Sequence, residues 1–341
     1  MEQKNLTSKN IVIFSDGTGQ KGGEGVNTNV YHIYNMIENR TPRQIAYYDS
    51  GIGSGRRDKL KGLTGRGFSK NILDCYKFLF DNYESNDKVY LFGFSRGAAT
   101  VRSLAGFVNM FGVLPKSRDD LIKKAYKIYK ITDKKERKTM ADNFIGRHHT
   151  MGCDIKFIGV WDTVAALGAP TPILDKLINL FPYTKHKFHD LGLGESVQHA
   201  RHALAIDENR KTFKPEIWDT KLCKKDQTLK QVWFTGVHTD VGGGYAEKGL
   251  SDIALEWMLD EAKPHGLLIY GKNRVITCPD VNGKMHDHNH GVNRWLSKAD
   301  RSWPYDTHGT PDVHQSVIDR AEHNNYNPWI TQNKQGYNIV K

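Results

Sequence analysis

Short apolar runs alternate with amphipathic stretches through the first part of the chain. The runs begin at Ile11, Gln44 and Val89, and each is followed by a loop that contains glycine. Between them, apolar residues recur at helical spacing over 30–37 and 68–83. Buried parallel strands joined by amphipathic helices produce this order. The pattern therefore predicts an α/β fold with a mostly parallel central sheet and helices on both faces.

The strand pattern is interrupted once and then resumes. Residues 117–150 are basic and lack apolar runs, which predicts an inserted helical segment of the kind that often forms a lid. Beyond it we expect strands over 154–161 and 231–240, and helices over 195–206, 250–262 and 317–321. With 341 residues, 38% of them hydrophobic, the chain can bury one large core. We expect a single domain over 1–341, with a C-terminal segment over about 263–341.

The run from Val89 ends at Ser95, which lies between Gly93 and Gly97. This Gly-x-Ser-x-Gly spacing, with a strand before it and a helix after it, is typical of the strained turn that exposes a nucleophilic serine above a sheet. Side chains at the two glycine positions would collide with the backbone. The five-residue pattern also arises by chance, but its flanks favour a nucleophile.

A serine nucleophile needs a base, which is commonly a histidine held by a carboxylate. In α/β-hydrolases the chain order is serine, acid, histidine, and the histidine follows the last strand. The candidates in that region are His308, His314 and His323, and His314 is favoured because it falls in the first turn of the last predicted helix.

Two carboxylates, Asp162 and Asp240, follow predicted strands and could serve as the acid. Their spacing along the chain does not separate them, and either could instead be a turn residue. Asp240 could also order its loop or bind a cation together with Asp16 and His238. The oxyanion hole is expected from the backbone N–H of Arg96 and from an early strand-end loop.

That early loop is Asp16-Gly-Thr-Gly19, so its expected donors are the N–H groups of Gly17 and Thr18. A phosphate-binding turn is the alternative, but the loop lacks both nucleotide-binding glycine patterns. The run His286, His288 and His290 suggests a metal site only weakly, because it has no cysteine partner and no metalloprotease motif. We expect neither a cofactor nor a metal.

Lysine and arginine number 49 against 38 aspartate and glutamate, and this excess of +11 favours an anionic partner. Two basic segments, 56–66 and 116–138, carry much of it, although charge runs are often only solvated surface. The four cysteines show no disulfide or zinc spacing, and no apolar run is long enough to span a membrane. We expect no signal peptide, because residues 1–10 are polar. We expect synthesis in the cytosol.

Five blocks, in this order, resemble the type VI lipase effector family, once catalogued as a domain of unknown function: Phe14-Ser-Asp-Gly-Thr-Gly19 with Asn27-Thr-Asn29, Gly93-Phe-Ser-Arg-Gly-Ala98, Gly159-Val-Trp-Asp-Thr-Val164, Ala203-Leu-Ala-Ile-Asp-Glu208, and Trp233-Phe-Thr-Gly-Val-His-Thr-Asp-Val-Gly-Gly-Gly-Tyr245. The resemblance implies an α/β-hydrolase fold, phospholipase activity, and Ser95, Asp162 and His314 as nucleophile, acid and base. It also implies delivery out of the cell by a type VI system, with a delivery or immunity protein as partner. The chain is shorter than the large effectors and is expected to lack their C-terminal membrane-targeting region.

The sequence thus predicts a serine hydrolase that cleaves carboxylic esters of lipids, most simply a phospholipase, through an acyl-enzyme. Its basic excess would draw it to an anionic membrane surface. A soluble carboxylesterase or thioesterase is one alternative. A non-enzymatic protein that binds an anionic partner through its basic faces is the other, although no nucleic-acid partner is expected because aromatic residues are sparse in the segment 56–66.

Overall fold

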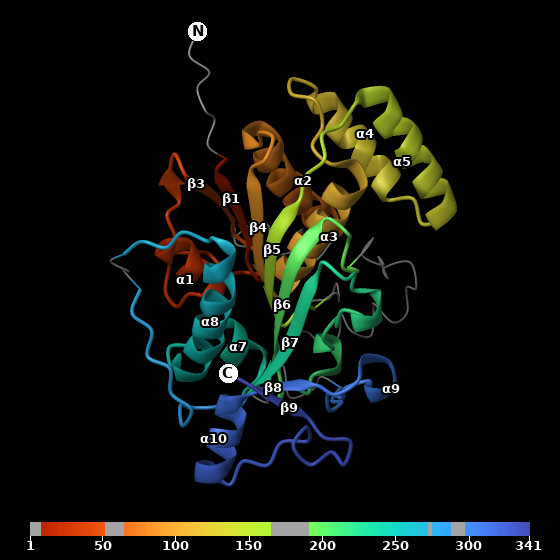
Figure 1. Ribbon diagram of the computed structural model, residues 1–341. Helices are drawn as coiled ribbons and strands as arrows, with labels where there is room; N and C mark the ends of the chain where they lie inside the picture. Colours follow the sequence, from red (N-terminus) through yellow and green to blue (C-terminus); the bar gives the residue numbers. More distant parts are fainter. Residues whose placement is uncertain (1–7, 52–64, 165–190, 272–274, 288–296) are drawn as a thin grey trace.

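The computed structural model describes residues 8–51, 65–164, 191–271, 275–287 and 297–341 (Figure 1). Its described strands form one nine-stranded sheet in the order β2-β3-β1-β4-β5-β6-β7-β8-β9. The pairs are parallel except that β2 runs antiparallel to β3. The strands are β1 (Asn10–Ser15), β2 (Arg40–Thr41), β3 (Gln44–Asp49), β4 (Lys88–Phe94), β5 (Ile155–Trp161), β6 (Val197–Ala205), β7 (Thr228–Phe234), β8 (Asp312–His314) and β9 (Asn338–Val340). The predicted mostly parallel α/β sheet is confirmed.

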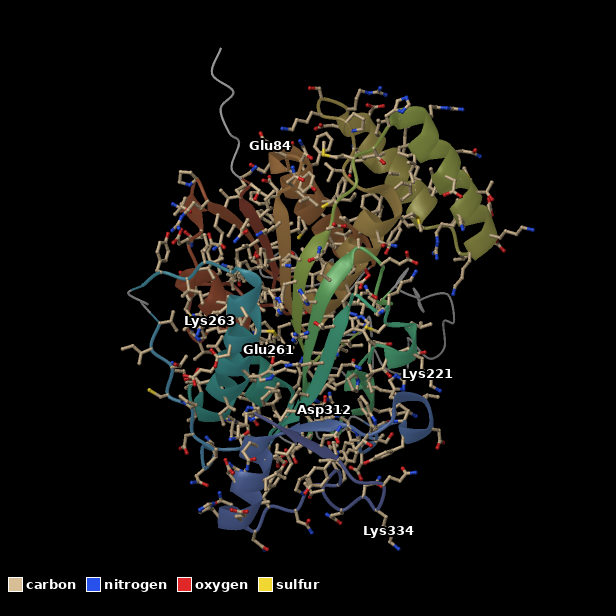
Figure 2. All side chains as sticks on the ribbon, in the orientation of Figure 1. Glu84, Lys221, Glu261, Lys263, Asp312 and Lys334 are labelled. Carbon is tan, nitrogen blue, oxygen red and sulfur yellow. The ribbon has the colours of Figure 1, made fainter. Side chains whose placement is uncertain are left out.

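Helices cover both faces of this sheet (Figure 1). On one face lie α2 (Gly65–Asn82) and α3 (Arg96–Phe111), and on the other lie α1 (Asn29–Met36) and α8 (Gly249–Ala262). Successive residues of a strand point to opposite faces of the sheet, so Leu91 packs with α2 and α3 whereas Phe92 packs with α1 and α8. Glu261 of α8, labelled in Figure 2, also pairs with Arg201 of β6 and Lys230 of β7.

The inserted segment forms two helices, α4 (Asp119–Tyr129) and α5 (Lys134–His148), which pack against α3 (Figure 1). They join the last turn of α3 to the first residue of β5, and Val113 pairs with Met151 where the chain enters and leaves the insertion. Because α3 is about 24 Å long and starts beside Ser95, the insertion lies at the opposite end of the sheet from that serine. The two helices of the insertion therefore do not lie over Ser95.

The helix predicted over 195–206 is also wrong, because this segment is the strand β6. Its alanines and Leu204 have high helix propensity, and their spacing matches one face of a helix. However, β6 pairs with β5 on one side and β7 on the other, and both of its faces are covered. A strand buried on both faces has no polar alternation by which it could be recognised.

The C-terminal segment extends the sheet and packs against its edge. It forms α9 (Tyr305–His308), β8, α10 (Gln315–Asn324) and β9, and a short helix, α7 (His238–Gly242), follows β7. A separate apolar cluster joins this segment to β6 and β7, with Trp233 at its centre. The rings of Trp303 and Trp329 meet Trp233 edge to face at 6.2 and 5.4 Å. The segment beyond α8 is thus anchored to the sheet by buried aromatic contacts.

The junction of β4 and α3 has no room for side chains at the two glycines that flank Ser95, Gly93 and Gly97. A Cβ at Gly93 would lie 2.6 Å from the Gly97 carbonyl oxygen, and one at Gly97 would lie 2.0 Å from the Ser15 carbonyl oxygen. Ser95 itself has φ 57°, a backbone conformation that costs energy for a residue with a side chain. These are the features of a strained turn between a strand and a helix that expose a serine.

We predict that Gly97→Ala lowers the free energy of unfolding by about 1–3 kcal/mol or more, because the new methyl group would overlap the β1 backbone. Gly146→Ala in α5 is the matched control, since a Cβ there meets nothing within 4 Å. The control should gain about 0.5–1 kcal/mol from helix propensity. Urea denaturation measures both, and equal effects of the two substitutions would contradict the packing described for the turn.

Candidate active site

Ser95 is fixed by the strand beside its own. Its N–H donates to the Trp161 carbonyl at 3.1 Å, and its carbonyl accepts the Val164 N–H at 3.3 Å. Both partners flank the end of β5, so the serine and the residue that ends β5 are held in one register. Ser95 is partly exposed, whereas the residues on either side of it are buried. The hydroxyl therefore sits at the carboxyl edge of the sheet, where open α/β sheets place their functional groups.

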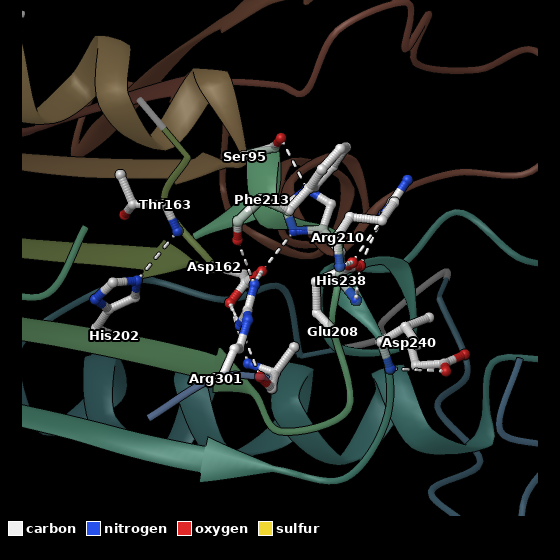
Figure 3. Close-up of polar contacts among 12 residues, drawn as sticks. Ser95, Asp162, Thr163, His202, Glu208, Arg210, Phe213, His238, Asp240 and Arg301 are labelled. Carbon is white, nitrogen blue, oxygen red and sulfur yellow. Dashed lines mark hydrogen bonds and ion pairs between the residues drawn. The ribbon is translucent and has the colours of Figure 1, made fainter. Parts of the chain in front are cut away.

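The partner of the Ser95 hydroxyl is His238, the first residue of α7 (Figure 3). His238 Nε2 lies 2.8 Å from Ser95 Oγ, and its Nδ1 lies 2.5 Å from Asp162 Oδ2. An ionised carboxylate only accepts, so Nδ1 carries the proton and Nε2 is free to accept from the serine. The imidazole packs between the rings of Phe94 and Phe213, at centroid distances of 4.6 and 5.0 Å. Ser95, His238 and Asp162 thus form one continuous hydrogen-bonded series.

Asp162 has no exposed surface and lies at φ 40°, directly after β5. Its Oδ1 accepts the Ala205 N–H at 3.1 Å, and both oxygens accept from Arg301, at 2.6 Å for Oδ1 and 2.8 Å for Oδ2. Burial alone would raise the pKa of this carboxyl, but the Arg301 guanidinium and the His238 hydrogen bond outweigh burial and hold that pKa below its ordinary value. The acid is therefore ionised.

His314, the base predicted from the sequence, is not part of this arrangement, because the structure places His238 and not His314 between Ser95 and Asp162. It is the N-cap of α10, where its Nδ1 accepts the Ser316 N–H at 3.3 Å, and its ring stacks on Phe234 at 4.8 Å. Burial lowers the pKa of His314 to about 4. The last strands extend the sheet sideways and carry His314 away from β4, whereas α7 brings His238 back to it. The other two candidates bond within their own segments, His308 to Thr307 and His323 to the Asp319 carbonyl.

Asp240, the alternative acid, faces a different histidine. Its Oδ1 lies 2.6 Å from His286 Nδ1, and its Oδ2 accepts the N–H groups of Val237 and His286 at 3.1 Å each. Asp240 therefore ties α7 to the loop around His286, and Asp162 is the acid next to His238. Of the predicted histidine run, His288 and His290 lie outside the described residues. No cluster of three metal-binding side chains occurs in the described part of the chain.

The loop expected to supply an oxyanion donor lies against Ser95. A Cβ at Gly17 would be 3.6 Å from Ser95 Cβ. Asp16 orders this loop, since its oxygens accept from Gly17 N, Thr28 Oγ1 and Tyr48 Oη at 2.6, 2.7 and 2.6 Å. Asp16, His238 and Asp240 thus each bond to different partners. Of the predicted oxyanion donors, the Gly17 N–H already donates to Asp16 Oδ1.

Two residues of the site were missed at the level of sequence. His238 satisfies the order serine, acid, histidine as well as His314 does, and it closes an apolar run, so the motif order contained a signal for it. Arg301 lies in a polar stretch with no motif. The pairing of Arg301 with Asp162 joins residues 139 positions apart, which no local pattern predicts.

The chain matches the family model described as "T6SS, Phospholipase effector Tle1-like, catalytic domain" over residues 9–261. The chain belongs to this family. The matched residues include Ser95, Asp162 and His238, and they end before Arg301. The family resemblance expected from the sequence is therefore confirmed.

Individual proteins similar to this chain match it only in part. An uncharacterised protein of Saccharomyces cerevisiae is 32% identical over 235 residues, which are 61% of this chain and 32% of the yeast protein. A crystal structure of an uncharacterised Pseudomonas aeruginosa protein has a TM-score of 0.47 at 17% identity, covering 77% of this chain and 47% of that one. The Tle1 effector, solved bound to the VgrG spike of the type 6 secretion system, has a TM-score of 0.40 at 19% identity, covering 70% of this chain and 51% of that one. The chain thus spans about a third to a half of these proteins.

We predict that His238→Ala slows labelling of Ser95 by a fluorophosphonate about 10³-fold or more, because the serine then has no base. His314→Asn should label within about twofold of wild type, since asparagine also caps a helix and His314 does not touch the triad. The measurement is the labelling rate followed by mass spectrometry. A large loss in His314→Asn together with normal labelling in His238→Ala would reverse the assignment.

Proposed function

We propose that this chain is a serine hydrolase that cleaves carboxylic esters of lipids, and that phospholipids are its substrates. The observation that carries the proposal is the hydrogen-bonded series Ser95, His238 and Asp162 at the carboxyl edge of a parallel sheet. Membership of the Tle1-like family supports the lipid substrate, because its members are described as phospholipase effectors.

In the proposed mechanism, Ser95 Oγ attacks the ester carbonyl while His238 Nε2 takes the hydroxyl proton. Asp162 keeps the imidazole oriented and stabilises the imidazolium that forms. The backbone N–H groups of Thr18 and Arg96 donate to the oxyanion. His238 then gives its proton to the leaving alcohol, which breaks the ester bond and leaves the acyl group on Ser95. Water, deprotonated by His238, attacks the acyl-enzyme and releases the fatty acid.

The basic surface gives less support for membrane binding next to Ser95 than the net charge of the sequence suggested. The exposed cations Lys123, Lys127, Lys134 and Lys138 belong to α4 and α5, at the far end of the sheet from Ser95. A bilayer bound there would lie away from the nucleophile. Most of the other basic segment, 56–66, lies outside the described residues. No helix in the described part of the chain is long and apolar enough to cross a membrane.

Delivery is a further part of the proposal. The family description names the type VI secretion system, and on that basis we propose that such a system delivers this chain and that a delivery or immunity protein binds it.

We predict that the wild type releases fatty acid from mixed phosphatidylethanolamine and phosphatidylglycerol vesicles, and that Ser95→Ala reduces the rate about 10³-fold or more because it removes the nucleophile. Fatty acid release is measured by mass spectrometry. Ser251→Ala is the matched control, because it removes a hydroxyl that bonds only within its own helix region, to the Lys248 carbonyl. Its rate should equal that of wild type.

Equal release by the wild type and Ser95→Ala would overturn the mechanism. Short-chain monomeric esters separate a lipase from a soluble esterase. A rate that does not rise when the ester begins to form micelles, together with intact vesicles, would replace the phospholipase proposal by a soluble carboxylesterase or thioesterase.

A further inference from the structure

Arg301, a buried arginine of the C-terminal segment, forms an ion pair with Asp162 (Figure 3). We propose that Arg301 is a positioning residue that keeps the Asp162 carboxylate ionised and aimed at His238, and so sets the lower pH limit at which Ser95 is reactive. This inference rests on the proposed function, because it assumes that His238 is the base for Ser95.

The geometry is that of a two-pronged pair. Arg301 Nη1 donates to Asp162 Oδ1 at 2.6 Å and Nη2 donates to Oδ2 at 2.8 Å, so each carboxylate oxygen has its own donor. The same nitrogens donate to the carbonyls of Ala205 and Phe213, at 2.6 and 2.8 Å. Phe213 also packs on the His238 ring. Arg301 is 7% exposed, so solvent screens this pair little. Its hydrogen bonds fix the plane of the carboxylate.

The position of Arg301 is set by its own segment. Two residues further on, Trp303 is buried against Trp233 of β7. On the other side, Ala299 N–H donates to the Asn209 carbonyl at 2.8 Å. Because these contacts restrict the backbone on both sides of Arg301, its guanidinium is held close to Asp162. The triad therefore depends on a segment that lies beyond the residues matched to the family.

Other charged side chains around the triad are paired with partners other than Asp162. Glu208, which accepts the His238 N–H at 3.3 Å, is paired with Arg210 at 2.7 Å. Asp240 faces His286, and burial lowers the pKa of His202, which bonds Thr163 next to the acid, to about 3. In the described part of the chain, Arg301 is the cation in contact with Asp162.

Without Arg301, the Asp162 carboxylate, which has no exposed surface, would keep only two of its described hydrogen bonds, from the backbone N–H of Ala205 and the Nδ1–H of His238. A buried unbalanced anion favours proton uptake by itself or by its neighbour. If His238 takes the proton, Nε2 cannot accept from Ser95. If Asp162 takes it, the imidazole loses the charge that orients it and stabilises its protonated form. Either outcome removes activity at low pH and leaves it at high pH.

The test measures the rate at which a fluorophosphonate labels Ser95 in the full chain, from about pH 5 to about pH 9, the interval in which histidine bases titrate. In Arg301→Met, the acid limb of this profile should move to higher pH by about one unit or more. Arg301→Lys keeps the charge but loses the two-pronged geometry, so its limb should lie between those of Arg301→Met and wild type.

Arg320→Met is the matched control. Arg320 is a buried arginine of the same segment, 9% exposed, which donates to the carbonyls of Val281 and Gly283 and does not touch the triad. Its loss should leave the limb where it is in wild type. A uniform fall in rate across all pH values in Arg301→Met, with an unmoved limb, would show a purely structural role and overturn the proposal.

Two further outcomes also bear on the proposal. Should Arg301→Met not fold, Arg301→Lys carries the test, and an unmoved limb in that variant overturns the proposal. Should wild-type Ser95 not be labelled at all, the proposed function fails instead. Nitrogen-15 NMR of the histidine rings then still tests Arg301, since the coupled pair of His238 and Asp162 should take up a proton at higher pH in Arg301→Met than in wild type, and this uptake changes the His238 ring signals.

Discussion

An ionised carboxylate with no access to water is the constraint on which this site depends. Such a group is stable in a protein interior only if hydrogen bonds and an opposite charge replace its solvation. Asp162 meets that requirement with donors from three other parts of the chain: Ala205 at the end of β6, His238 at the start of α7, and Arg301 in the C-terminal segment. Satisfying one buried charge therefore fixes the relative positions of these segments.

The parallel sheet makes this convergence possible. Because parallel strands end at the same edge, Ser95 and Asp162 follow neighbouring strands, β4 and β5, and are joined through the backbone at Ser95 and Trp161. Glycines at the turn after β4 let the backbone of α3 approach β1 without side chains between them. Ser95 is thus held by local strain and close packing, whereas His238 and the guanidinium that balances the Asp162 charge come from distant segments.

The molecule also separates its charged surface from its chemistry. The basic insertion of α4 and α5 packs on the far end of α3, so its exposed lysines do not lie at the edge that carries Ser95. Two cations close to the triad are instead paired with carboxylates, the buried Arg301 with Asp162 and the partly buried Arg210 with Glu208. Net charge alone therefore says little about how a substrate approaches, since the position of each charge decides which part of the surface an anionic partner meets.

The sequence by itself determined the α/β class, most strands, the turn at Ser95 and the two strand-end acids, because buried runs, helical periodicity and glycine spacing are local properties. It did not determine that 197–205 is a strand, since coverage on both faces removes the alternation that identifies one. Nor did it choose His238 over His314 or reveal Arg301. Those outcomes depend on which strand ends lie next to each other and on how a buried carboxylate is neutralised, and contacts between residues far apart in the chain exist only in the folded protein.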